Sequence, residues 1–315
     1  MTSEAEGTGA DTATPPEFEE WRQAMRRVGA REGFFEPLGT GHAALYIERG
    51  DTLLVSFDRF GATARDALPP RAALAQEQNW SHLALTCRDE TWFRDPRVFD
   101  MFDHMTDDGF FDEFARVLFY GAGPAGYAAA AFSVAAPGAQ VVLLQPQATL
   151  DPDIAIWDER FTEMRALSFS DRYGYAPDMI EAAMQATLLY DPRETEDAMH
   201  AALFRRKNVT RVPLRSFGPA LEGTLVGMEM LDALLVAAAG GEVTPALIGR
   251  LSRSRHDHAP YLRRLTLECE RRGQYARALR VATLAHEHVG GRFFARRIRA
   301  LDRTTADAVA DTAAE

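Results

Sequence analysis

The chain of 315 residues has few cysteines and no long apolar run. Its two cysteines, Cys87 and Cys269, lie far apart, which argues against a disulfide framework and favours a reducing compartment. No stretch approaches the ~20 uninterrupted apolar residues that a membrane-spanning helix needs. The first residues also lack the basic-then-apolar pattern of a secretory signal. The sequence therefore predicts a cytoplasmic protein without a membrane partner.

Metal-ligand patterns are missing as well. The pairs His256-x-His258 and His286-x-His288 have a spacing of two, and such side chains point in different directions on a helix. No cysteine or further histidine completes a ligand set. The sequence also has no phosphate-binding loop and no base-stacking motif. We therefore predict no metal site.

Basic side chains are missing from the first residues of the chain, and acidic ones are few near its C-terminal end. The net charge is -11, and residues 1–20 hold six acids and no base. Residues 249–303 hold fourteen arginines and five acids, a local balance of +9. Such a basic segment can bind nucleic acid, but it can equally dock on its own acidic body. We expect docking or solvation here, and not a nucleic-acid partner.

Composition divides the chain into four parts. Residues 1–17 form an acidic leader with too little apolar surface to fold, so disorder is expected there. Residues 18–238 are expected to form an α/β domain, and residues 239–303 a basic helical extension. Residues 304–315 are expected to be a second disordered segment.

Strand and helix patterns alternate from about residue 52 to 235, which predicts a mostly parallel sheet flanked by helices. Apolar runs predict strands at residues 43–47, 52–57, 83–87, 117–120, 141–144, 186–190 and 209–214. The turn Arg49-Gly50-Asp51 predicts that the first two strands pair. Beyond Thr244-Pro245 the pattern is helical only. These helices are expected to pack on the sheet domain or on a second subunit, forming a homo-oligomer.

Residues 116–127 predict an apolar strand, a small-residue turn and a helix. Taken as Gly121-x-Gly123-x-x-Gly126, the turn matches a dinucleotide-binding fingerprint for FAD or NAD(P). That fingerprint needs an acid about 20 residues on, after the next strand, for the ribose hydroxyls. Gln145 stands there, and an amide accepts a hydrogen bond less strongly than a carboxylate.

The same turn also matches a nucleophile elbow, in which a strained turn presents a serine. The acid and the histidine of such a triad follow later strands, in that order along the chain. Asp191 follows the strand at 186–190, and the loop Ser216-Phe217-Gly218-Pro219 follows the last strand. Gly123 stands where the serine is expected.

Several segments carry a resemblance to a known family: Tyr120-Gly121-Ala122, Gly126-Tyr127, residues 146–150 and Tyr190-Asp191-Pro192. Over about residues 18–235 the chain resembles a bacterial α/β-hydrolase-like family whose elbow reads Tyr-Gly-Ala-Ser-Met-Gly-Gly-Tyr. The resemblance implies an α/β-hydrolase-like sheet and puts the family's serine at Gly123 and its histidine at Pro219. Neither residue can take part in proton transfer to or from a nucleophile.

We therefore predict a catalytically degenerate hydrolase-fold protein, without a cofactor, that binds a small molecule or a protein partner. Gly123, Asp191 and Pro219 are its vestigial triad positions. The residues expected to line the ligand pocket are Ser56, Phe57, Ala122, Gly123 and Pro124. Two alternatives stay open. One is an FAD- or NAD(P)-dependent oxidoreductase that uses Gly121, Gly123, Gly126 and Gln145. The other is an esterase-like hydrolase with an unrecognised nucleophile.

Overall fold

The structure, a computed structural model, describes residues 16–61 and 67–302. The predicted disordered segments lie almost wholly outside these ranges. Helix α1 (Pro16–Glu32) begins two residues before the predicted domain start. Phe18, Trp21 and Met25 recur along one side of α1 and pack with Leu45 and Ile47. The helix thus belongs to the sheet domain through its apolar face.

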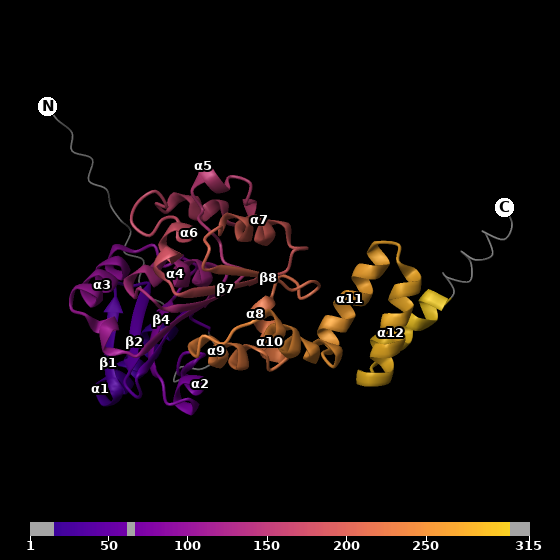
Figure 1. The fold of residues 1–315 in the computed structure, drawn as a ribbon, viewed down its shortest axis with the longest axis horizontal. Coiled ribbons are helices and arrows are strands. Elements are labelled where there is room, and N and C mark those ends of the chain that lie inside the picture. The colour runs from indigo at the N-terminus through magenta and orange to yellow at the C-terminus, as the bar shows by residue number, and fades with distance from the viewer. Residues whose placement is uncertain (1–15, 62–66, 303–315) are drawn as a thin grey trace.

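The core is one eight-stranded sheet with the order β1-β2-β4-β3-β5-β6-β7-β8 (Figure 1). Its strands are β1 (Gly33–Leu38), β2 (His42–Ile47), β3 (Thr52–Arg59), β4 (Ser81–Cys87), β5 (Arg116–Ala122), β6 (Gln140–Leu144), β7 (Gln185–Tyr190) and β8 (Val209–Pro213). The pairings β1·β2 and β2·β4 are antiparallel, and the other five are parallel. The predicted α/β-hydrolase-like, mostly parallel sheet is confirmed.

One predicted pairing is wrong. β2 and β3 do not form a hairpin, because β4 lies between them and pairs antiparallel with β2 and parallel with β3. The turn between β2 and β3 is tied to the start of β4: Arg49 donates its amide to Ser81 Oγ, and Gly50 donates its amide to Asn79 O. Edge strand β1, which contains Pro37, is absent from the sequence prediction.

Both faces of the sheet are covered by helices, which explains why the central strands are apolar throughout. Side chains alternate along β3: Val55 packs with α3 and α4, and Leu54 packs with α2, α8 and α9. The helices of the domain after α1 are α2 (Ala72–Glu77), α3 (Pro96–Asp107), α4 (Pro124–Phe132), α5 (Pro152–Ala155), α6 (Ala176–Met179), α7 (Thr195–Leu203), α8 (Leu221–Gly227) and α9 (Leu231–Ala239).

The extension is entirely helical in its described part and projects from the sheet domain (Figure 1). It contains α10 (Pro245–Leu251), α11 (Ala259–Arg271), α12 (Tyr275–Val289) and a helical stretch over residues 292–302. Thr244 caps α10 by accepting the amide of Leu247. No described helix combines the length and apolar character needed to cross a membrane.

Helix α11 joins the extension to the loop after β8. The ring of Tyr261 lies 5.3 Å from that of Phe217, and Arg264 donates to the carbonyl of Phe217. Glu268 is buried, pairs with Arg193 and accepts a hydrogen bond from Ser216 Oγ at 2.8 Å. The predicted packing of the extension on the sheet domain is therefore observed through α11.

Candidate functional site

The turn between β5 and α4 has the backbone of a strained elbow. Gly123 adopts φ +56° and ψ -123°, a region that residues with side chains seldom enter. Its amide donates to Leu144 O at 2.8 Å, and its carbonyl accepts the amide of Tyr127 at 3.0 Å. A Cβ atom on Gly123 would meet no described atom within 4 Å. The turn therefore presents this position to open space.

The other two glycines of the turn allow close packing. A Cβ on Gly121 would lie 2.1 Å from Ala125 O, and one on Gly126 would lie 3.1 Å from Gly121 O. At Gly121 only a residue without a side chain lets strand and helix approach this closely, and at Gly126 a Cβ would fit only if its neighbours moved by a few tenths of an ångström. Packing therefore accounts for both glycines without a bound phosphate.

Gln145, the ribose-binding candidate of the dinucleotide interpretation, is buried, and both polar atoms of its side chain have protein partners. Its Nε2 donates to Asp197 Oδ2, and its Oε1 accepts the amide of Leu221 at 2.9 Å.

Two adjoining cavities open beside Gly123. The larger, of about 340 Å³, is lined by Ala122, Gly123, Pro124, Gln145, Gln147, Arg160, Phe161, Asp197, Pro219, Ala220, Leu221, Glu222 and Gly223. The smaller, of about 180 Å³, is lined by Phe57, Asp58, Arg59, Cys87, Glu90, Phe93, Ala122, Pro124, Ala125 and Glu222. Ala122, Pro124 and Glu222 line both, so the two form one composite pocket.

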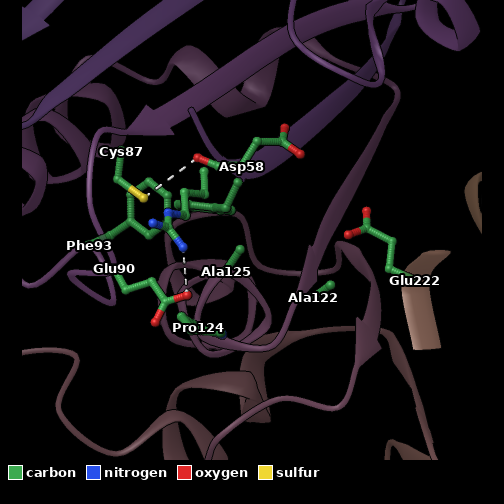
Figure 2. A pocket seen from close by; sticks show the side chains of 10 residues that line it. Asp58, Cys87, Glu90, Phe93, Ala122, Pro124, Ala125 and Glu222 are labelled. Atoms are coloured by element: carbon green, nitrogen blue, oxygen red, sulfur yellow. Dashed lines mark hydrogen bonds and ion pairs between the residues drawn. The ribbon is translucent and has the colours of Figure 1, made fainter. Parts of the chain in front are cut away.

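Four of the five residues predicted to contact a ligand line this pocket: Phe57, Ala122, Gly123 and Pro124. Ser56 does not, because it is fully buried in β3. Glu222, which the sequence analysis did not single out, projects from the first turn of α8 beside Ala122 (Figure 2). No local motif marks it, since it comes from a segment far from the elbow in the chain.

Asp191 lies directly after β7 and is completely buried. Its Oδ2 accepts the amide of Gly218 at 2.8 Å, and its Oδ1 accepts the amide of Arg193 at 3.0 Å. The carboxylate therefore holds the backbone of the loop in which a triad would place its histidine. Pro219 follows Gly218 and lines the larger cavity together with Gly123.

Pro124 is a second departure from a working elbow, and it was not predicted from the sequence. In a nucleophile elbow, the residue after the nucleophile donates its backbone N–H to the oxyanion. Proline has no N–H to donate. The signal was present in the sequence, because proline directly follows the nucleophile position.

The smaller cavity is lined by acidic groups (Figure 2). Burial, aided by the charge of Glu222, raises the pKa of Asp58 to about 7. Tyr120 donates its hydroxyl to Glu222 Oε1 at 2.6 Å, and burial raises the pKa of Tyr120 well above its usual value. Glu90 pairs with Arg59 at 3.0 Å. This cavity thus offers hydrogen-bond acceptors and proton-exchanging carboxyl groups.

Ser56, His82 and Asp58 superficially resemble a catalytic triad. Ser56 Oγ donates to Asp58 Oδ2 at 2.9 Å and lies 2.9 Å from His82 Nε2. A hydroxyl has one proton, so when Asp58 is ionised and accepts it, His82 Nε2 donates to Ser56 Oγ and does not act as its base. Burial lowers the pKa of His82 to about 3, which keeps the ring neutral. Ser56 and His82 therefore form a buried hydrogen-bonded support for Asp58.

The hydrolase alternative needs another nucleophile near the elbow. Among the described residues that line the two cavities, Cys87 is the one hydroxyl or thiol side chain. Burial and the charge of Asp58 raise the pKa of Cys87 to about 12, so its thiol stays protonated. Its Sγ donates to Asp58 O at 3.7 Å.

A hydrogen-bonded network forms one wall of the larger cavity. Arg160 bridges Asp158 and Asp197, and His200 Nε2 lies 3.0 Å from Asp158 Oδ2. Burial opposes ionisation of Asp158, but the hydrogen bonds from His200 and Arg160 outweigh it and hold its pKa well below the usual value. His200 Nδ1 accepts the amide of Ala148, so both ring nitrogens serve structure.

Metal ligands do not assemble in the described part of the chain. No three side chains of histidine, cysteine, aspartate or glutamate there are placed to hold an ion.

Comparison with known proteins gives likeness of fold alone. No protein-family description and no curated protein matches the sequence. A chain of the Gap123 glycosylation-associated protein complex of Streptococcus agalactiae is similar in structure, with a TM-score of 0.43 and 10% identity. The match covers 64% of this chain and 46% of that one, so this chain spans less than half of that protein.

Two smaller proteins are also similar. The capsule O-acetyltransferase of Neisseria meningitidis serogroup A has a TM-score of 0.40 and 11% identity, over 61% of this chain and 91% of that one. A protein described as a carboxylesterase, from Lactobacillus plantarum, has a TM-score of 0.36 and 10% identity, over 64% and 93%. At these values the likeness carries no argument about residues or activity.

Proposed function

We propose that this protein is a catalytically degenerate member of the α/β-hydrolase fold that binds a small molecule in the composite pocket beside Gly123. The observation that carries the proposal is the elbow itself. It keeps the strained backbone and opens onto a cavity, but Gly123, Pro124 and Pro219 supply no nucleophile, no oxyanion donor and no base.

The chemistry supports degeneracy. Acyl transfer through an elbow needs a nucleophile, a base to take its proton and donors for the oxyanion. Loss of one oxyanion donor alone typically lowers kcat about 10²- to 10³-fold. The elbow here lacks all three groups, which leaves binding as the function of the pocket.

The pocket suits a small ligand better than a protein surface. A cavity of about 340 Å³ falls in the usual range of ligand sites, which is roughly 300 to 1,000 Å³. Phe57, Phe93 and Phe161 provide apolar contacts, and Gln147, Asp58 and Glu222 provide polar ones. This mixture favours an uncharged or cationic ligand with an apolar portion.

Restoration of the missing groups tests degeneracy. The unmodified protein should neither react with a fluorophosphonate nor cleave p-nitrophenyl butyrate. Gly123→Ser with Pro219→His should remain nearly inactive, because Pro124 still lacks its N–H. Adding Pro124→Ala should raise cleavage at least tenfold over the double variant. Reaction of the unmodified protein with the fluorophosphonate would overturn the proposal.

Ligand binding can be tested by substituting two glycines that both have open space around them. Gly223 in α8 and Gly249 in α10 are exposed, and a Cβ on either would meet no described atom within 4 Å. Gly223 lines the larger cavity, whereas Gly249 does not. Short acyl esters and the corresponding alcohols, which are uncharged, should raise the melting temperature of the protein and of Gly249→Trp. Gly223→Trp should lose the shift; an equal shift in both variants would place the ligand elsewhere.

The dinucleotide alternative makes a different prediction. A bound flavin would colour the purified protein yellow, and NAD(P)H would protect it against thermal unfolding. Either result would favour the oxidoreductase over the pocket proposed here.

A further inference from the structure

An apolar groove lies in the helical extension, away from the elbow. It has a volume of about 450 Å³ and is lined by Arg255, His256, Tyr261, Leu262, Leu265, Val281, Leu284, Ala285 and His288. Its residues come from a 3-10 turn (Ser252–His256), from α11 and from α12. Leu284 is 56% exposed, which is unusual for a leucine that faces other apolar side chains.

The groove is one side of a hairpin whose other side is covered. Residues 292–302 pack against the α11–α12 pair: Phe294 clusters with Ala282 and Ala285, and Leu301 clusters with Cys269 and Ala278. Leu262 and Leu284 lie in the groove, where the described part of the chain provides no covering segment.

The charge around the groove has one predominant sign. On α12, Arg277, Val281, Leu284 and His288 have the spacing of a single helix face, so an arginine extends the apolar stripe. Arg255 lies at the other rim. Of the five acids in residues 249–303, Glu268 pairs with Arg193, and Glu270 pairs with Arg297. Asp257, Glu287 and Asp302 are exposed but do not line the groove.

We infer that this groove docks an acidic amphipathic helix of a partner protein. Apolar side chains at helical spacing would enter between Leu262, Val281 and Leu284, and flanking acids would face Arg255 and Arg277. Groove-to-groove pairing of two copies would bring like charges together. Nucleic acid would leave Leu284 without an apolar partner.

The test uses a fluorescein-labelled 18-residue peptide with leucines at positions i, i+3, i+4 and i+7 of a glutamate-rich helix. One control peptide has lysines in place of the glutamates, and another has the same composition with leucines at alternate positions. Fluorescence anisotropy with the full chain should give the acidic helix at least tenfold tighter binding than either control. Equal binding of the respaced peptide would overturn the inference.

Protein variants locate the site. Leu284→Asp should weaken binding at least tenfold, and Arg277→Glu should weaken it and reduce its salt dependence. Val236→Asp is the matched control, because Val236 is an exposed apolar residue of α9 outside the groove. Equal effects of Leu284→Asp and Val236→Asp would refute the site. Because Leu284 is exposed, unchanged thermal unfolding should show that its variant folds.

Other occupants give distinct results. A dimer detected by light scattering and dissociated by Leu284→Asp would show that a second copy fills the groove, which would overturn the inference. A single-stranded oligonucleotide that binds more tightly than the peptide and is equally sensitive to Leu284→Asp would overturn it too. Gly223→Trp should leave peptide binding unchanged, so this test is independent of the elbow pocket.

Discussion

Asp191 Oδ2 accepts the backbone amide of Gly218 at 2.8 Å, inside a fully buried environment. A carboxylate that would orient an imidazole in a hydrolase triad is thus used here to fix the loop backbone. This contact connects the end of β7 to the wall of the larger cavity, because Pro219 follows Gly218. Asp191 is therefore expected to contribute to stability and pocket shape.

Replacement of Asp191 should destabilise the protein. Asp191→Ala would leave the amides of Gly218 and Arg193 without their acceptor, at a cost of about 2 to 3 kcal/mol. Urea unfolding measures this difference. The control is Asp232→Ala, because Asp232 is a 60% exposed partner of Arg71 and should contribute less than about 1 kcal/mol. Equal stabilities of the two variants would contradict the role assigned to Asp191.

Replacement of Gly123 by alanine should show the backbone strain of the elbow as a loss of stability. Gly123→Ala adds a methyl group that meets no described atom within 4 Å, but at φ +56° it should cost about 1 to 3 kcal/mol. Gly223→Ala, in helix α8 and equally uncrowded, should instead stabilise by about 0.5 to 1 kcal/mol. Thermal unfolding would show opposite shifts; a shift of the same sign in both would argue against strain at Gly123.

The buried carboxyl of Asp58 should make stability fall as pH rises. Its pKa is raised from 3.8 to about 7 in the folded state, so the folded protein holds a proton that the unfolded chain releases above pH 4. The stability of the wild-type protein relative to Asp58→Asn should therefore fall by roughly 2 to 3 kcal/mol between pH 5 and pH 8. Urea unfolding at both pH values checks this.

His82 changes the stability in the opposite direction at lower pH. The effect of Asp58 is therefore measured as the difference in unfolding free energy between wild type and Asp58→Asn, and not from the wild-type pH curve alone. Its pKa is lowered to about 3, and the stability that its neutral ring contributes is lost as pH falls below about 6.5. Both proteins contain His82, so its effect largely cancels in the difference. A difference that stays constant with pH would refute the raised pKa of Asp58.

The junction between the sheet domain and the extension should depend on Glu268. Glu268→Ala removes the partner of Arg193 and the acceptor of Ser216 Oγ, and should cost about 2 to 3 kcal/mol. Hydrogen exchange in α11 should increase. Glu287→Ala, at an exposed position of α12, should change neither quantity. Unchanged exchange in Glu268→Ala would show that other contacts hold α11.

The sequence predicted the strands well because each central strand is a continuous apolar run, and burial on both faces requires that pattern. Val141 to Leu144 is an example. It also placed Gly123 and Asp191 correctly relative to their strands, since both positions follow from chain order. Strand neighbours were less predictable: the turn at Gly50 indicates a reversal, but not that β4 inserts between β2 and β3.

The pocket was less predictable than the fold. Ser56 alternates with Phe57 along β3, and a one-residue difference decides which side chain reaches the cavity. Glu222 reaches the elbow only because the loop after β8 returns the chain there, which no local pattern reveals. The pKa of Asp58 is raised by tertiary burial and by the charge of Glu222, and no local sequence pattern reveals either cause.

The packing of residues 292–302 on the α11–α12 hairpin sets a practical limit on shortened versions of the chain. Proteolysis at Gly290-Gly291 would strip Phe294 and Leu301 from Ala278 and Ala282 and leave the hairpin apolar on two sides. Such a fragment should aggregate. An expression boundary placed before Thr244 avoids this by removing the whole hairpin, although it also removes Tyr261 from Phe217.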